Sequence, residues 1–239
     1  MQLIIDVKNL YEEASKSMPI EDFDFLKQEK LLEKYARTVG IWYGDENTMK
    51  TWNFIGNGCE SHVYECKDIT KIIKVMNYNI YSSSPKQFLE ERIVLYNQLF
   101  SETAYELIGF ARFYDDFCFV LTQPFIEGDR LELEEIESEM NNRGFYGQYY
   151  KFINQQCMVE DLHQGNVLKD KSGNIFVIDA IPSFIVPNSQ KDFDNFVFND
   201  YYLQRQKDMQ IAIKKMAKYP LSFEEKREQT QFILDSLYL

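Results

Sequence analysis

Apolar residues recur at helical spacing in the first part of the chain. Phe23, Leu26 and Tyr35 have helix-like spacing within a charged stretch, and Gly40 is a suitable stop signal. We therefore expect residues 1–50 to be mainly helical. The pattern changes near Trp52, where short runs of β-branched and aromatic residues begin.

These short runs are separated by turn signals, a pattern that is typical of strands. Three strands are expected, at Trp52–Ile55, His62–Cys66 and Lys71–Met76, with residues 67–70 as the turn before the third. The pattern predicts a small antiparallel sheet early in the chain.

One amphipathic helix is predicted after this sheet, from Lys86 to Phe100. Ser84 is a favourable N-cap, and Pro85 suits the first helical turn. The apolar face recurs at three- and four-residue steps and consists of Leu89, Ile93, Tyr96 and Phe100.

The rest of the chain mixes extended and helical patterns. Extended segments are expected at residues 104–111 and 117–123, before a break at residues 124–128. The later expected elements are two helices at residues 131–142 and 145–156, a hairpin of residues 166–169 and 175–178, and helices after Pro187. This order indicates an α+β protein with a small sheet lobe ahead of a helical lobe.

The same pattern divides the chain into three parts. We expect a helical N-terminal extension at residues 1–50, an N-lobe at residues 51–126 and a C-lobe at residues 127–239.

Composition supports a packed protein. The chain is 45% hydrophobic and 15% aromatic, and its formal net charge is −12. An acidic surface repels nucleic acid and anionic membranes, and no basic run offsets it, so neither partner is expected. The four cysteines form no C-x-x-C pair, which disfavours a zinc site and fits reduced thiols in the cytoplasm.

Candidate chemistry gathers around one segment. Asp161 is followed by Asn166 and, after the predicted hairpin strands, by Asp179. A phosphoryl-transfer site needs a carboxylate near the attacking hydroxyl, and an amide and a second carboxylate for Mg²⁺. Asp161 is therefore the candidate base, and Asn166 and Asp179 are the candidate metal ligands. For Asp161 and Asn166 alone, local backbone capping is the more common role.

A glycine-containing turn lies between the first two predicted strands. Gly56, Gly58 and Ser61 occupy a G-x-G-x-x-S pattern, which would let backbone N–H groups approach phosphate oxygens. An ordinary hairpin turn is the alternative interpretation, and the strand that follows excludes a Rossmann turn.

Lys74 lies within an Ile/Val strand, where an unpaired lysine would be costly if buried. It would make sense as a phosphate ligand paired with a carboxylate of the next helix, either Glu90 or Glu91. His163 has no partners for a metal site, so it is expected to orient the loop or to touch phosphate.

The segment Asp161-Leu162-His163-Gln164-Gly165-Asn166 resembles the D-L-H-x-G-N motif of aminoglycoside phosphotransferases and related small-molecule kinases. Residues 101–110, 123–126 and 160–169 resemble more closely the polyvalent protein kinase family of bacterial mobile elements and phages. The resemblance covers about residues 50–185. It implies a bilobal protein-kinase-like fold that binds ATP and Mg²⁺ between its lobes, with Lys74 and His163 beside the catalytic Asp161. The backbone around Gln123 and Phe125 would then receive the adenine.

The chain also departs from the kinase pattern. Glu160 replaces the arginine before the catalytic aspartate, Ala180 and Ile181 replace the Phe and Gly of D-F-G, and no A-P-E triplet follows. Residues 180–239 are expected to be too few for a full peptide-docking lobe, which argues against a protein substrate and loop phosphorylation.

Two main functions follow from these patterns. The first is an ATP- and Mg²⁺-dependent phosphotransferase that acts on an unidentified hydroxyl acceptor, either a small molecule or a protein. The alternative is a pseudokinase-like module that contacts a partner protein through residues 1–50. An accessory protein of mobile elements with no ligand is a third interpretation.

Overall fold

The computed structural model describes residues 2–17, 24–148 and 150–185. It confirms the α+β class predicted from the sequence. The helices expected after Pro187 lie outside the described residues. None of the helices within the described ranges combines the length and apolar character that a membrane span requires.

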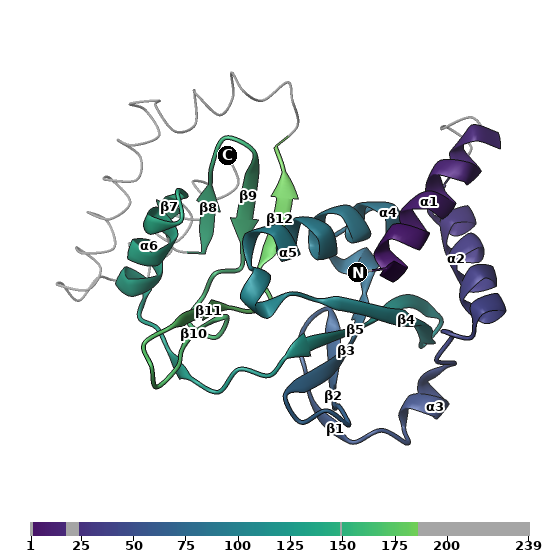
Figure 1. The fold of residues 1–239 in the computed structure, drawn as a ribbon, viewed down its shortest axis with the longest axis horizontal. Helices are drawn as coiled ribbons and strands as arrows, with labels where there is room; N and C mark the ends of the chain where they lie inside the picture. Colours follow the sequence, from purple (N-terminus) through teal and green to yellow (C-terminus); the bar gives the residue numbers. More distant parts are fainter. Residues whose placement is uncertain (1, 18–23, 149, 186–239) are drawn as a thin grey trace, which may run out of the picture. The chain divides into compact units, whose positions relative to one another are not determined.

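A five-stranded sheet occupies the first half of the described chain, in the order β1-β2-β3-β5-β4 (Figure 1). All its strand pairs are antiparallel. The strands are β1 (Phe54–Asn57), β2 (Ser61–Glu65), β3 (Lys71–Asn77), β4 (Glu106–Phe113) and β5 (Asp116–Pro124). The predicted strands and extended segments are therefore confirmed, with shifts of one or two residues at their ends, including the start of the first strand.

That first strand begins at Phe54 rather than at Trp52. The Trp52 N–H instead closes a turn onto the Met49 carbonyl at 2.9 Å, and its ring packs edge-on against Tyr43 and Tyr64. Because these contacts hold Trp52 outside the sheet, the predicted start is wrong by two residues.

The helix predicted at residues 86–100 is present as three consecutive segments. They are α4 (Pro85–Gln87), the π-helix η3 (Phe88–Leu95) and α5 (Tyr96–Leu99). The Ser84 side chain caps the start by accepting the Gln87 N–H at 3.2 Å, as predicted. Leu89, Ile93, Tyr96 and Phe100, the four residues of the predicted apolar face, are all completely buried, so that face is confirmed even though residues 88–95 are π-helical.

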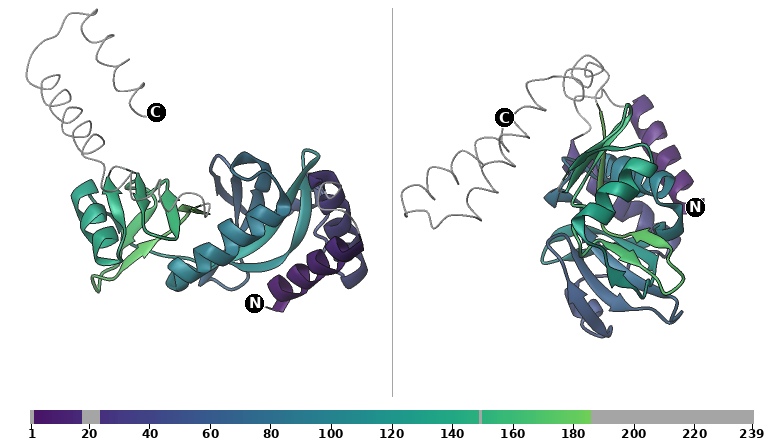
Figure 2. Two further views of the ribbon diagram at one scale, coloured as in Figure 1. Left: turned by 90° about the horizontal axis from the view of Figure 1, so that it is seen from above. Right: turned by 90° about the vertical axis from the view of Figure 1, so that its left-hand side faces the viewer.

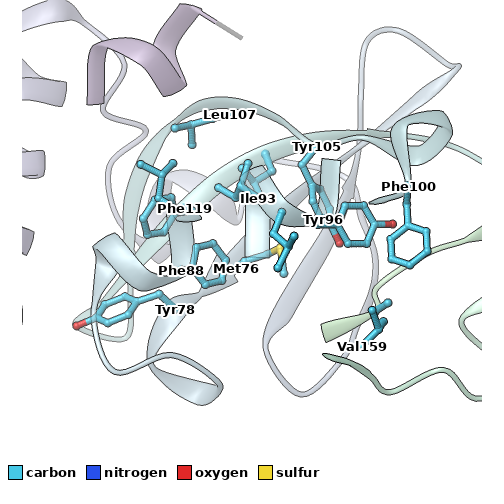
Figure 3. Close-up of a cluster of buried hydrophobic side chains, with 14 of the residues drawn as sticks. Met76, Tyr78, Phe88, Ile93, Tyr96, Phe100, Tyr105, Leu107, Phe119 and Val159 are labelled. Atoms are coloured by element: carbon cyan, nitrogen blue, oxygen red, sulfur yellow. The ribbon is translucent and has the colours of Figure 1, made fainter. Parts of the chain in front are cut away.

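The buried face of this helical region fills the main core. Phe88, Ile93 and Tyr96 gather beside Met76 of β3 and Phe119 of β5 (Figure 3). The same cluster includes Val159, Leu162, Val167, Val177 and Ala180 from the second half of the chain. One continuous core therefore anchors both the sheet and the segments that carry the candidate catalytic residues.

The N-terminal helices α1 (Gln2–Ser17) and α2 (Phe25–Val39) pack against β4, as Figure 2 shows from two further sides, and a short helix α3 (Glu46–Met49) follows. Gly40, with φ 79°, ends α2 as predicted. Arg112 of β4 ties the sheet to α2, because its side chain reaches Glu29 at 3.3 Å and Glu33 at 3.1 Å.

Short 3-10 turns and two further sheets complete the described chain. The turns are η2 (Tyr78–Ile80) and η4 (Ser101–Thr103). A three-stranded sheet has the order β11-β10-β6, from β6 (Asp129–Arg130), β10 (Val167–Lys169) and β11 (Ile175–Val177). The predicted hairpin of residues 166–169 and 175–178 is thereby confirmed. The acidic helix α6 (Leu133–Asn142) begins two residues later than predicted, because Glu132 forms a capping box with Glu135.

The helix predicted at residues 145–156 is wrong. This segment forms a hairpin within a four-stranded sheet of order β12-β9-β8-β7. Its strands are β7 (Tyr146–Gln148), β8 (Lys151–Ile153), β9 (Cys157–Glu160) and β12 (Ile181–Phe184). Gly147 allows the close pairing, since a Cβ there would lie 2.2 Å from the Lys151 carbonyl oxygen.

Candidate active site

Strands β9 and β12 bring the two candidate aspartates to the same end of the four-stranded sheet. Glu160, the last residue of β9, pairs in register with Ile181, the first residue of β12. Asp161 follows β9 directly, and Asp179 precedes β12 by two residues. The expected loop between a helix and a hairpin is therefore a loop between two strands.

Both aspartates have backbone conformations that residues with side chains rarely adopt. Asp161 has φ 63° and Asp179 has φ 55°. Aspartate tolerates this left-handed region better than most residues, yet the conformation still costs about 1–2 kcal/mol. Such costs are concentrated at functional sites, where the surrounding structure holds the residue in place.

Asn166 fixes Asp161 from across the loop. Its Nδ2 donates to the Asp161 carbonyl at 2.9 Å and to Asp161 Oδ2 at 3.1 Å. The Ile178 N–H in turn donates to the Asn166 carbonyl at 2.8 Å, which joins Asn166 to the residue before Asp179. Asn166 and Asp161 therefore form one hydrogen-bonded unit, which is linked to Asp179 through the backbone of the residue before it.

His163 contacts two residues of the same loop. Its Nδ1 accepts the Gly165 N–H at 2.9 Å, and its Nε2 lies 3.7 Å from Asp161 Oδ1. A Cβ at Gly165 would lie 2.7 Å from the imidazole ring, so a glycine is needed for this close approach. The ring of Tyr150 packs edge-on against His163 from the β7–β8 turn.

Lys74 of β3 forms an ion pair with Asp179, although the two residues are far apart in the sequence. The Lys74 side chain is only 3% exposed, and its Nζ lies 5.7 Å from the centre of the Tyr105 ring. The Tyr105 hydroxyl also donates to Asp179 Oδ1, at 2.9 Å. The structure thus brings the predicted phosphate ligand onto one of the predicted metal ligands.

The surroundings of Asp179 and Tyr105 shift the pKa of both side chains. Burial alone would raise the pKa of Asp179, but Lys74 and the Tyr105 hydrogen bond outweigh it and hold that pKa below its ordinary value. Burial, followed by the Asp179 charge, raises the pKa of Tyr105 well above its ordinary value. Asp179 is therefore a carboxylate, and the Tyr105 hydroxyl keeps its proton.

The predicted partner of Lys74 is wrong. Glu90 pairs with Lys86 at 3.7 Å, and Glu91 accepts hydrogen bonds from Gln87 at 2.9 Å and from the Phe184 N–H at 3.1 Å. Neither glutamate is among the buried residues of η3, and their side chains contact Lys86, Gln87 and Phe184 instead of Lys74. The helix presents the buried Arg92 to the site instead of a carboxylate.

The glycine-containing turn is the hairpin between β1 and β2. The Gly58 N–H donates to the Ser61 carbonyl at 2.9 Å, and Ser61 is buried. A Cβ at Gly56 would meet no atom within 4 Å, and the φ of Gly56 is not left-handed. Neither the packing nor the backbone of the fold therefore demands glycine at position 56.

The two expected adenine contacts have different environments. The Gln123 side chain is buried and donates to the Thr103 carbonyl at 3.0 Å and to the Tyr96 hydroxyl at 3.2 Å. Phe125 is exposed, and its N–H is already bonded to the Thr70 carbonyl at 2.8 Å. The Gln123 side chain supports the core, and the Phe125 N–H closes the end of the sheet.

Three residues of the site were not identified from the sequence: Glu60, Arg92 and Tyr105. Glu60 and Tyr105 lie in segments whose patterns were recognised, but their spacing alone gives no role. Arg92 carried one usable signal, because a charge three residues after Leu89 and four before Tyr96 falls on the predicted apolar face.

Comparison with known families identifies the family of the chain. A family model described as "Serine/Threonine/Tyrosine Kinase found in polyvalent proteins" matches residues 26–184. No curated protein matches the sequence. The matched range begins within α2 and ends at the last residue of β12, so it includes every candidate site residue.

Proposed function

Because the chain belongs to the family of serine/threonine/tyrosine kinases found in polyvalent proteins, we propose that it transfers a phosphoryl group from ATP, with Mg²⁺, to a hydroxyl acceptor. The observation that carries the proposal is the ion pair between Lys74 and Asp179. A lysine for the phosphates and a carboxylate for the metal must meet in such a site, and here they do.

The free oxygens of the site fit Mg²⁺. The Lys74 and Tyr105 hydrogen bonds both reach Asp179 Oδ1, so among the described residues Oδ2 is left for a cation. Asn166 uses its Nδ2 toward Asp161, which leaves its Oδ1 as a ligand. Carboxylate and amide oxygens are hard ligands of the kind that Mg²⁺ prefers. The ion would neutralise negative charge on the phosphates as transfer proceeds.

The chain's own residues would bind, orient and accept a proton. Lys74 would bind phosphate oxygens, and the backbone at Gly56 and Gly58 would approach them closely. Asp161 would orient the acceptor hydroxyl and take its proton. Its position is already fixed by Asn166, and geometry comes before proton affinity in a general base.

The division into lobes is part of the same proposal. Residues 51–126 would cover the nucleotide, and residues 127–239 would carry the catalytic loop and the metal ligands. Helices α1 and α2 would act as a brace on the sheet, since their apolar faces contribute Val7, Tyr11 and Leu32 to the main core.

Nucleotide binding is tested first, by thermal shift with ATP plus Mg²⁺ against ATP plus EDTA. A ligand that binds only the folded state raises the melting temperature, so the proposal expects a larger shift with Mg²⁺. Asp179→Asn should abolish the Mg²⁺-dependent part. Asp129→Asn, which changes an exposed carboxylate on β6, is the matched control and should keep it. No shift of the wild type at saturating nucleotide would refute the proposal.

Catalysis is tested by ADP release. Asp161→Asn should lower the turnover of ATP at least about 100-fold, as expected for loss of a general base, while the thermal shift with ATP and Mg²⁺ remains. Equal turnover by the two proteins would remove Asp161 from its role. Binding without turnover in the wild type would support the pseudokinase-like alternative instead.

A further inference from the structure

Four charged side chains of alternating sign form a cluster at the site. Glu60 pairs with Arg92, and Lys74 pairs with Asp179. The two pairs are close enough to interact electrostatically. The charges of Asp179 and Lys74 act on the Glu60 carboxylate, and the charge of Arg92 acts on the Asp179 carboxylate. The second pair belongs to the proposed phosphate and metal site, whereas the first pair has no assigned role.

Arg92 connects three separate parts of the chain. It lies in η3, its side chain is 2% exposed, and its Nη2 binds Glu60 in the turn between β1 and β2. Its Nη1 donates to the Ala180 carbonyl at 2.6 Å. Ala180 directly follows Asp179, so the guanidinium joins the glycine-containing turn to the residue next to the proposed metal ligand.

Stability alone does not account for this pair. A buried ion pair is often no better for stability than well-packed apolar side chains, unless all of its polar atoms are satisfied. Within the described residues, Glu60 Oε2 and Arg92 Nε are buried and have no hydrogen-bond partner. A pair that leaves two polar atoms unsatisfied is poorly suited to a purely stabilising role.

Asp179 needs a constraint of the kind that Arg92 supplies. Its left-handed backbone, with φ 55°, persists only if neighbouring groups hold it. The hydrogen bond from Arg92 to the Ala180 carbonyl holds the peptide between Ala180 and Ile181, one residue after Asp179, and so limits the path by which the chain leaves Asp179. That conformation is the one in which the Asp179 carboxylate reaches Lys74 and Tyr105.

We infer that Arg92, held by Glu60, is a positioning residue that sets the backbone of Asp179 for metal-dependent nucleotide binding. This inference rests on the proposed function. The helix η3 therefore contributes a cation, Arg92, that orients the metal ligand. The sequence had predicted a carboxylate from this helix, paired with Lys74. Through Glu60, the position of the glycine-containing turn becomes linked to the position of Asp179.

The decisive variant is Arg92→Lys in the full chain. Lysine can keep the charge that faces Glu60, but it lacks the planar fork that reaches a carboxylate and a carbonyl together. The dissociation constant of ATP is measured by calorimetry in MgCl₂ and in EDTA. The value in EDTA divided by the value in MgCl₂ is the binding ratio, which reports how much Mg²⁺ strengthens binding. Supporting residues of metal ligands typically affect metal affinity 10- to 100-fold, so this ratio should fall at least about tenfold.

Arg112→Lys is the matched control, because Arg112 also joins carboxylates to a carbonyl. It binds Glu29 and Glu33 and donates to the Asp115 carbonyl at 2.7 Å, all outside the site. Its variant should lower the melting temperature without changing the binding ratio. An equal fall of the ratio in both variants, or an unchanged ratio in Arg92→Lys, would overturn the inference.

A second variant keeps the test decisive if Arg92→Lys does not fold. Glu60→Gln retains a hydrogen-bond acceptor for Arg92 but removes the charge that holds it, so the same ratio should fall. An unchanged ratio in Glu60→Gln would overturn the inference while leaving the proposed function standing. A wild-type protein that binds no ATP in either buffer would overturn both.

Discussion

At the scale of single residues, glycines and charged side chains carry most of the functional signal. The structure gives a structural reason for Gly165, whose Cβ would clash with His163, and for Gly147, whose Cβ would clash with β8. It gives none for Gly56, where a Cβ would meet open space. A glycine that the fold does not need is a good candidate for contact with a ligand.

This contrast predicts opposite effects of two Gly→Ala changes. Gly56→Ala should leave the melting temperature unchanged but weaken ATP binding by roughly 1 kcal/mol, about fivefold in the dissociation constant. Gly173→Ala should do the reverse, because its φ of 87° disfavours alanine by about 1–2 kcal/mol in a turn away from the site. Calorimetry with ATP and thermal unfolding distinguish the two. Loss of stability in Gly56→Ala would assign that glycine to the fold.

A second prediction concerns Cys118, which is buried in β5. Burial is the main cause that raises the pKa of its thiol from 9.0 to about 12. The unfolded chain therefore loses this proton at a lower pH than the folded chain, and stability should fall as pH rises above 9. The loss approaches about 1.4 kcal/mol per pH unit between the two pKa values.

Urea unfolding in reducing buffer at pH 8 and pH 10 measures this effect. Cys118→Ala should lose less stability than the wild type over that interval, although it is less stable at pH 8. Cys59→Ala, which changes an exposed thiol, should keep the wild-type dependence. A parallel fall in Cys118→Ala and the wild type would show that the thiol is not responsible.

At the scale of elements, the sequence predicted the helices and strands that local periodicity and turn signals define. The five strands of the first sheet and the hairpin before Asp179 have clear alternation or turn signals, and they were found with small shifts. The segment from Phe145 to Gln156 was misassigned because its aromatic residues fit a helical face as well as a strand. The strand conformation is fixed by the pairing of β7 with β8 and of β8 with β9, which the spacing of the aromatic residues does not show.

The candidate site divides in the same way. Asp161, Asn166 and Asp179 lie in one motif and its hairpin, so spacing was sufficient to identify them. The partner of Lys74 is Asp179, which lies in a different element far along the sequence, so the periodicity of the helix could not identify it. Arg92 and Glu60 are paired across the fold, and neither residue reveals the other in the sequence.

Gly147→Ala tests whether the misassigned segment is a hairpin, because the two structures predict opposite signs. In a helix this change would stabilise the protein by about 1 kcal/mol. In the hairpin the new Cβ lies 2.2 Å from the Lys151 carbonyl oxygen, so overpacking should destabilise the protein by about 1–3 kcal/mol. Urea unfolding gives the sign. Gly144→Asn is the control and should be nearly neutral, since its left-handed position has open space and suits asparagine.

At the scale of the whole described molecule, the kinase core and the N-terminal helices share one set of buried side chains. The family match begins within α2, yet α1 contributes Ile4, Val7 and Tyr11 to the main core. The same core contains Phe88 of η3 and Phe119 of β5, the strand that pairs with β3, where Lys74 lies. A helix that is only an appended partner-binding segment would have no such buried face.

Two aspartate substitutions on α1 distinguish a brace from an appendage. Val7 is completely buried, whereas Ile5 on the same helix is 45% exposed. Val7→Asp would bury an unpaired carboxylate and remove apolar packing, so it should cost at least about 3 kcal/mol and greatly lower the melting temperature. Ile5→Asp should change stability by no more than about 0.5 kcal/mol, because its side chain already faces water. If both variants unfold at the wild-type temperature, α1 is not part of the folding unit, and residues 1–17 are free to serve another purpose. If only Val7→Asp is destabilised, the shared core makes α1 part of the kinase fold.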